Sequence, residues 1–160
     1  MFQGPCYNLS NNGVSISSAI TALQLKAGVN GPIEIMRASL TQSSITTSGQ
    51  CLGGLIRKSA AATVTIAVAG TNLKKLNPAA PTADASLGTA ATGFTASAEG
   101  SDSDLTTQRG FNTLNGWEYL PIPEERMMVP QAGICGLKFL SSPTSATWVA
   151  EIAFRELRGG

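Results

Sequence analysis

The feature that most constrains the fold is a strict alternation of apolar with polar or small residues in two segments, 135–139 and 148–154. The apolar residues fall on every second position: Cys135, Leu137, Phe139, Trp148, Ala150, Ile152 and Phe154. Successive side chains of a β-strand point to opposite faces, whereas a helix brings every third or fourth residue to one face. The pattern therefore predicts two β-strands, each with one face in the core.

The rest of the chain has the same character. Short runs rich in Val, Ile, Thr and aromatic residues are separated by Gly, Pro and Asn, and helical periodicity is almost absent. Between residues 33 and 40 the apolar phase slips from Ile33 and Ile35 to Met36, Ala38 and Leu40. One extra residue in a strand produces such a slip, so we expect a β-bulge near Met36.

The predicted fold class is all-β: a β-sandwich of jelly-roll type with about eight short antiparallel strands, a barrel being the nearest alternative. A length of 160 residues suits one domain. We expect an N-terminal arm over 1–12, a single domain over 13–157 and a flexible tail over 158–160. Two long surface loops are expected within the domain, over 70–86 with its two closely spaced prolines and over 99–108 with its acidic turn.

Only 13% of the residues are charged, about half the fraction of an ordinary soluble domain, while 42% are hydrophobic. The buried centres of protein interfaces avoid charged side chains, so this composition favours large permanent contacts, with a Ser/Thr-rich β surface as the alternative. The net charge is +1 and the cations are scattered, which predicts no nucleic-acid partner. The adjacent Lys74 and Lys75 are interpreted as a solvated loop pair.

No apolar stretch approaches the ~20 residues of a membrane span, and residues 1–12 lack the cationic start and apolar run of a signal peptide. We therefore expect synthesis in the cytosol and no membrane partner.

Histidine is absent, which removes Ser-His-Asp and Cys-His nucleophile systems and histidine-ligated zinc motifs. No glycine-rich phosphate-binding motif is present. A glycosidase would need two carboxylates facing one cleft, and the available residues are Glu118, Glu124, Glu125, Glu151 and Glu156. Chance supplies that many in most proteins, so we expect no enzyme and no cofactor.

Two further patterns concern metals and thiols. Asp102 and Asp104 lack the additional oxygen ligands of a calcium loop and are interpreted as a solvated acidic turn, so no metal site is expected. The three cysteines are widely spaced, and we expect Cys51 and Cys135 to be small buried residues outside any disulfide framework.

The segment 117–126 is the most specialised part of the chain, since it combines aromatic residues, stiffening prolines and adjacent opposite charges. Aromatic residues and Arg contribute disproportionately to protein interfaces. Its candidate subunit-interface residues are Trp117, Tyr119, Glu124, Glu125 and Arg126. In the alternative interpretation Trp117 covers the core and Arg126 pairs with a nearby carboxylate.

The first twelve residues carry aromatic residues and few charges, which suits an arm that becomes ordered against a neighbour. Its candidate contact residues are Phe2, Pro5 and Tyr7. A frayed terminus is the alternative interpretation.

Five features of the sequence carry a resemblance to a known class of proteins. They are an alternating segment ending in Ala27-Gly28, the strand Pro32-Ile33-Glu34-Ile35, an Ala/Pro/Thr/Gly-rich middle, the segment Gly116-Trp117-Glu118-Tyr119-x-Pro-x-Pro-Glu-Glu-Arg and the segment Gly133-x-x-Gly136-Leu137-Lys138-Phe139. With these features the chain resembles small jelly-roll virion proteins of tailed bacteriophages, which decorate or cement an icosahedral head. The resemblance is most specific from Gly116 to Leu140.

The resemblance implies a non-enzymatic homotrimer that binds the major capsid protein on the outer surface of the virion, after assembly in the host cytoplasm. It also implies that Phe2, Pro5 and Tyr7 of the N-terminal arm contact the capsid. The alternative is another virion part, such as a tail, head-fibre or receptor-binding module. A glycan-binding module is a further alternative, in which exposed Trp117 and Tyr119 would stack against sugars.

Overall fold

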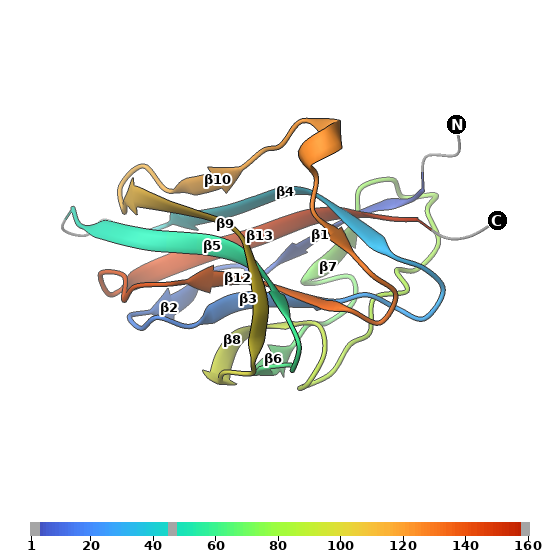
Figure 1. The fold of residues 1–160 in the computed structure, drawn as a ribbon, viewed down its shortest axis with the longest axis horizontal. Coiled ribbons are helices and arrows are strands. Elements are labelled where there is room, and N and C mark those ends of the chain that lie inside the picture. The colour runs from blue at the N-terminus through green and yellow to red at the C-terminus, as the bar shows by residue number, and fades with distance from the viewer. Residues whose placement is uncertain (1–3, 45–47, 158–160) are drawn as a thin grey trace.

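The structure is a computed structural model that describes residues 4–44 and 48–157, and it is a sandwich of two antiparallel sheets (Figure 1). The seven-stranded sheet consists of β1 (Cys6–Ser10), β2 (Val14–Ile16), β4 (Ile33–Gln42), β7 (Leu73–Lys75), β10 (Trp117–Tyr119), β11 (Met128–Val129) and β13 (Ala146–Glu156). The six-stranded sheet consists of β3 (Thr21–Lys26), β5 (Gln50–Lys58), β6 (Thr63–Ile66), β8 (Gly93–Ala98), β9 (Asp102–Asn112) and β12 (Ile134–Phe139). A single 3-10 turn, η1 (Pro123–Glu125), is the one helical element of the described residues, and no helix there is long and apolar enough to cross a membrane.

The strand pairing is that of a jelly roll. The first main strand pairs with the last, β1 with β13, and the next pairs are nested inside it: β3 with β12, β4 with β10 and β5 with β9. Contacts of β4 with β13 and of β5 with β12 then join these pairs into two sheets. Eight strands folded in this way are the jelly-roll architecture, so the predicted fold class is confirmed. The five remaining strands are short additions.

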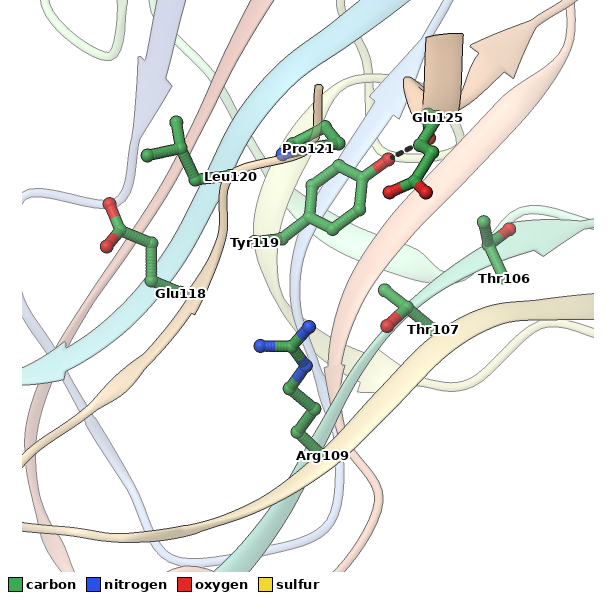
Figure 2. Close-up of a pocket in the computed structure, with 8 residues that line it drawn as sticks. All are labelled: Thr106, Thr107, Arg109, Glu118, Tyr119, Leu120, Pro121 and Glu125. Carbon is green, nitrogen blue, oxygen red and sulfur yellow. Dashed lines mark hydrogen bonds between the residues drawn. The ribbon is translucent and has the colours of Figure 1, made fainter. Parts of the chain in front are cut away.

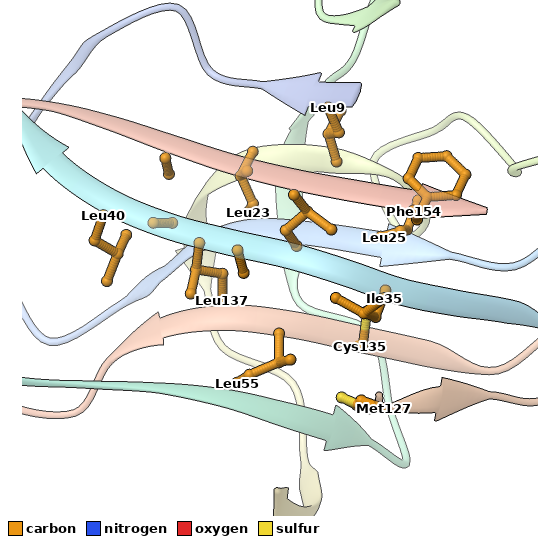
Figure 3. Packing of buried hydrophobic residues seen from close by; sticks show 14 of the residues in the cluster. Leu9, Leu23, Leu25, Ile35, Leu40, Leu55, Met127, Cys135, Leu137 and Phe154 are labelled. Atoms are coloured by element: carbon orange, nitrogen blue, oxygen red, sulfur yellow. The ribbon is translucent and has the colours of Figure 1, made fainter. Parts of the chain in front are cut away.

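The core lies between the two sheets and consists of the side chains that alternation assigns to the inner faces (Figure 3). Trp148 is fully buried there, with its ring edge-on to Phe139 at 4.9 Å and to Phe111 at 6.2 Å between ring centroids. Aromatic pairs of this geometry contribute about 0.5–1.5 kcal/mol beyond the area that they bury. The two strands predicted from the alternation, now β12 and β13, thus each contribute a row of buried side chains to the core.

The expected β-bulge is present at Met36. Ala153 of β13 pairs with Arg37, but the next residue, Phe154, pairs with Ile35, which leaves Met36 without an opposite residue. The extra residue allows Ile35 and Ala38 to face the same core although they are three positions apart.

The expected arm over 1–12 is corrected by the structure from Cys6 onward. Strand β1 lies between β13 and β7, and its Tyr7 and Leu9 are buried in the core. The alternation of these two residues places them on one face of a strand, and burial of that face outweighs the freedom of a terminus. Pro5 is half-buried, and its carbonyl oxygen accepts a hydrogen bond of 3.1 Å from the Glu156 N–H. Phe2 lies outside the described residues.

The expected loop over 99–108 is also corrected, because β9 begins at Asp102 and pairs with β5 along its length. Two basic residues of β5 neutralise the aspartates that made this segment look like a turn: Arg57 lies 2.6 Å from Asp104, and Lys58 lies 2.8 Å from Asp102. Two register shifts within the pair accommodate the irregular start of β9. The other expected loop, 70–86, contains the short strand β7, and the expected tail over 158–160 lies outside the described residues.

The three thiols are free, and Cys51 and Cys135 are buried as expected. Burial raises the pKa of Cys135 to about 12. This thiol is therefore protonated at neutral pH, and it serves packing.

Candidate functional site

A hollow of about 540 Å³ opens where the two sheets end (Figure 2). Strand β9 is the last strand of the six-stranded sheet, and β10 is the last strand of the seven-stranded sheet. The hollow lies between them and is lined by Thr106, Thr107, Arg109, Glu118, Tyr119, Leu120, Pro121 and Glu125. The hollow therefore lies at the edge of the sandwich where these two strands meet.

The wall formed by β10 depends on the residue before it. Gly116 has φ +74°, and a Cβ there would lie 2.8 Å from the carbonyl oxygen of Leu40. A side chain at this position would be strained and would clash with β4, so glycine permits the chain to turn into β10. The turn directs Trp117 into the core, where it is 3% exposed, and leaves Glu118 at the surface.

Tyr119 fastens the rim of the hollow. Its hydroxyl donates to the carbonyl oxygen of Glu125 at 2.9 Å and accepts from the N–H of Met127 at 3.0 Å. Burial raises the pKa of Tyr119, although the Met127 N–H acts in the opposite direction, so the phenol stays protonated and keeps its donor. Together with Pro121 and Pro123, these bonds hold the segment 120–127 in one conformation.

Arg126 forms an ion pair within its own chain. Its guanidinium lies 3.5 Å from the carboxylate of Glu34. This buried carboxylate also accepts two hydrogen bonds from Arg155, the one from Nε at 2.8 Å. Two guanidinium groups therefore share one carboxylate beneath the rim. Arg126 thus follows the alternative interpretation, in which it pairs with a nearby carboxylate.

The carboxylates at and beside the hollow differ from the other carboxylates of the chain in their hydrogen bonds and ion pairs. Of its ten carboxyl side chains, only Glu118, Glu124 and Glu125 have neither an ion pair nor a hydrogen bond to their carboxylate within the part of the chain that the structure describes. The guanidinium of Arg109 likewise has no partner among residues 4–44 and 48–157. These groups are available to a partner molecule without breaking existing bonds.

Apolar side chains accompany these charges. Leu120 is 71% exposed and Ile122 is 58% exposed, both between β10 and η1. Leu105 in β9 and Leu114 in the turn before β10 are also exposed. Exposed leucines beside donors and acceptors that have no partner are the chemistry of a protein contact surface. We call the hollow together with the adjoining residues Ile122 and Glu124 the β9–β10 rim.

The structure brings some of the expected interface residues together and separates others. Tyr119, Glu124 and Glu125 lie at the β9–β10 rim, whereas the indole of Trp117 is in this chain's own core and cannot reach a partner. Tyr7 is a core residue as well, on the far side of the seven-stranded sheet in its strand order. This corrects both expectations, because burial in the chain's own core leaves neither ring accessible.

Arg109, Thr106 and Thr107 were not expected at the site. They lie in β9, and no local pattern connects them to residues 118–125. The nested pairing of a jelly roll, which places the fifth and sixth main strands at the same open edge, is the signal that would have indicated them.

A second charged cluster, around Lys58, is satisfied internally. Its Nζ lies 2.8 Å from Asp102 and 3.3 Å from Glu99, and Lys138 lies at the same distances from these two carboxylates. Burial alone would raise the pKa of Glu99, but hydrogen bonds from Thr21 and the two lysines outweigh it, so the pKa lies below its ordinary value. The cluster stabilises the junction of β3, β5, β9 and β12.

Comparison of the chain with protein-family models, with curated proteins and with solved structures finds no match.

Proposed function

We propose that this chain is a non-enzymatic structural protein of a virus particle, a cement or decoration protein. In this proposal it binds the major capsid protein on the outer surface of the shell as a homotrimer and stabilises the head. Repeated on a shell, many copies of a modest contact add up, because each bound copy joins neighbouring shell subunits.

The observation that carries the proposal is the β9–β10 rim. Leu120, which is 71% exposed, lies there close to Ile122 and to charged groups that have no partner in the described residues. The neighbouring Tyr119 is held in place by two hydrogen bonds of its hydroxyl. Such a surface is costly to leave in water and is already rigid, so its burial against a partner loses little conformational entropy. The low charge of the chain, 13%, favours permanent contacts in the same way.

The glycan-binding alternative receives less support. It relied on Trp117 and Tyr119 as a stacking platform, and Trp117 is 3% exposed. Only Tyr119 of that pair lies at the hollow. A tail or head-fibre module remains the second candidate, since the same exposed rim would serve contacts in those assemblies.

The proposal is tested on purified particles with and without this protein. A cement protein raises the temperature at which heated heads release DNA, and adding the purified protein back to bare heads restores that temperature. Equal release temperatures with and without the protein would reject a stabilising role. A variant with Leu120→Ser and Ile122→Ser is expected to fold normally and fail to restore it, whereas Leu87→Ser, at an exposed leucine of the β7–β8 connection, serves as the matched control.

A further inference from the structure

The carboxylates of the β9–β10 rim have a counterpart at the other end of the same sheet. In the seven-stranded sheet the strand order begins with β10 and ends with β7. Strand β7 carries Lys74 and Lys75, both exposed, and is followed by Leu76, which is 56% exposed. Neither lysine has an ion pair within residues 4–44 and 48–157.

The two ends of the sheet carry opposite charges, each beside an exposed leucine. The rim has the three carboxylates Glu118, Glu124 and Glu125 with one cation, Arg109, which leaves an excess of negative charge beside exposed Leu120. The β7 end has two positive charges beside exposed Leu76. We call residues 74–76 the lysine edge.

One chain cannot join its own two ends, because three strands of the sheet lie between them (Figure 1). We infer that the lysine edge of one copy docks on the β9–β10 rim of the next copy. This inference rests on the homotrimer of the proposed function and names its contact.

The placement of the two surfaces dictates the symmetry. A two-fold contact uses the same patch on both copies, whereas surfaces at opposite ends of one sheet meet head to tail. A head-to-tail contact leaves one lysine edge and one rim open until the chain of copies closes into a ring. A ring of three copies satisfies every rim and every lysine edge, and it has the symmetry that a threefold position on a shell requires.

The energetics divide between two groups of residues. Exposed ion pairs contribute little each, and salt screens them. Leu76 against Leu120 adds apolar burial, which salt does not weaken. The lysines and glutamates therefore determine which surfaces meet, and the leucines supply most of the affinity. The association is expected to weaken in concentrated salt without disappearing.

The test is a charge swap on the full chain. Lys74→Glu with Lys75→Glu, and separately Glu124→Lys with Glu125→Lys, each places like charges across the contact and is expected to weaken self-association tenfold or more at low salt. The protein carrying all four substitutions has opposite charges again and the original net charge, and it is expected to recover the trimer. Lys26→Glu reverses another cation that has no ion pair in the described residues and serves as the control. Mass is measured by light scattering over a range of concentrations, and thermal unfolding confirms that each variant is folded.

Recovery of the trimer in the four-fold variant, after its loss in both double variants, would establish the contact. A trimer that persists in either double variant would overturn it, and so would a four-fold variant that stays dissociated. A wild-type protein that is monomeric at every concentration would overturn it as well. None of these results decides whether the protein stabilises heads, which the DNA-release measurement reports separately.

Discussion

The hydroxyl of Tyr119 accepts a hydrogen bond from the N–H of Met127 across a distance of 3.0 Å, which ties strand β10 to the chain beyond η1. The same hydroxyl donates to Glu125, so one phenol closes the loop 120–126 at two points. The exposed Leu120 and Ile122 belong to that loop. A single side chain therefore fixes the position of the apolar part of the β9–β10 rim.

Replacing Tyr119 with phenylalanine keeps the ring and removes both hydrogen bonds. We expect a loss of about 1–2 kcal/mol in the free energy of unfolding, because the Met127 N–H is left without a partner. Hydrogen exchange should accelerate at Met127 and in the loop. Tyr7→Phe is the matched control, since the Tyr7 hydroxyl bonds to Pro81 elsewhere in the fold. Unchanged exchange at Met127 in the Tyr119 variant would contradict this role.

Trp117 provides a test of core against interface. Because it is 3% exposed, Trp117→Ala should lower the free energy of unfolding by about 3–5 kcal/mol, the cost of a large cavity. Trp117→Phe should cost less, since it fills part of the same space. If the indole were instead an interface residue, the alanine variant would unfold at the wild-type denaturant concentration and lose only its oligomeric mass.

The cluster around Lys58 predicts sensitivity to acid. The pKa values of Glu99 and Asp102 lie below their ordinary values in the folded protein, because hydrogen bonds and the charges of Lys58 and Lys138 outweigh the opposing effect of burial. Their stabilisation is therefore complete above the unfolded-state pKa values of about 4 and is lost as pH falls through the folded ones.

Urea unfolding measured between pH 7 and pH 3 checks this expectation. The free energy of unfolding should fall below about pH 5, and it should fall less steeply in Glu99→Gln, which no longer binds a proton at this position. Glu124→Gln, at a carboxylate that has no partner in the described residues, should keep the wild-type slope. A Glu99→Gln slope identical to wild type would exclude a contribution from Glu99.

Thiol reactivity follows burial. Cys51 and Cys135 are buried, and burial raises the pKa of Cys135 to about 12, whereas Cys6 is half-buried. A disulfide reagent at pH 8 should therefore label Cys6 of the folded protein first and reach the other two thiols only on unfolding. Rapid labelling of Cys135 in native protein would contradict the core described here.

Much of the fold was accessible from the sequence because alternation reports which face of a strand is buried. The alternation predicted β12 and β13, and the phase slip located the bulge at Met36, since one extra residue changes the face of every residue after it. Tyr7 and Leu9 show the same alternation and are buried in the structure. Their position near the N-terminus nevertheless favoured the interpretation of residues 1–12 as an arm. The sequence did not predict strand β9, because its aspartates are typical of a turn. Only the structure shows that Arg57 and Lys58 of β5 pair with them.

The site was only partly predictable, for a physical reason. Local sequence indicated that 117–126 is special and rigid, but exposure depends on which way each residue faces. Trp117 faces inward and Leu120 outward, although their separation along the chain is small. The contribution of Arg109 arises from pairing between distant strands, which no local pattern contains.

The central claim is that this chain is a repeated cement on the outer surface of a viral head. Imaging intact particles by electron microscopy, with the copies counted and located, tests it most directly. The account predicts hundreds of copies in a fixed ratio to the major capsid protein, grouped as trimers on the outer surface. A dozen or fewer copies, confined to the tail or to a single vertex, would contradict it.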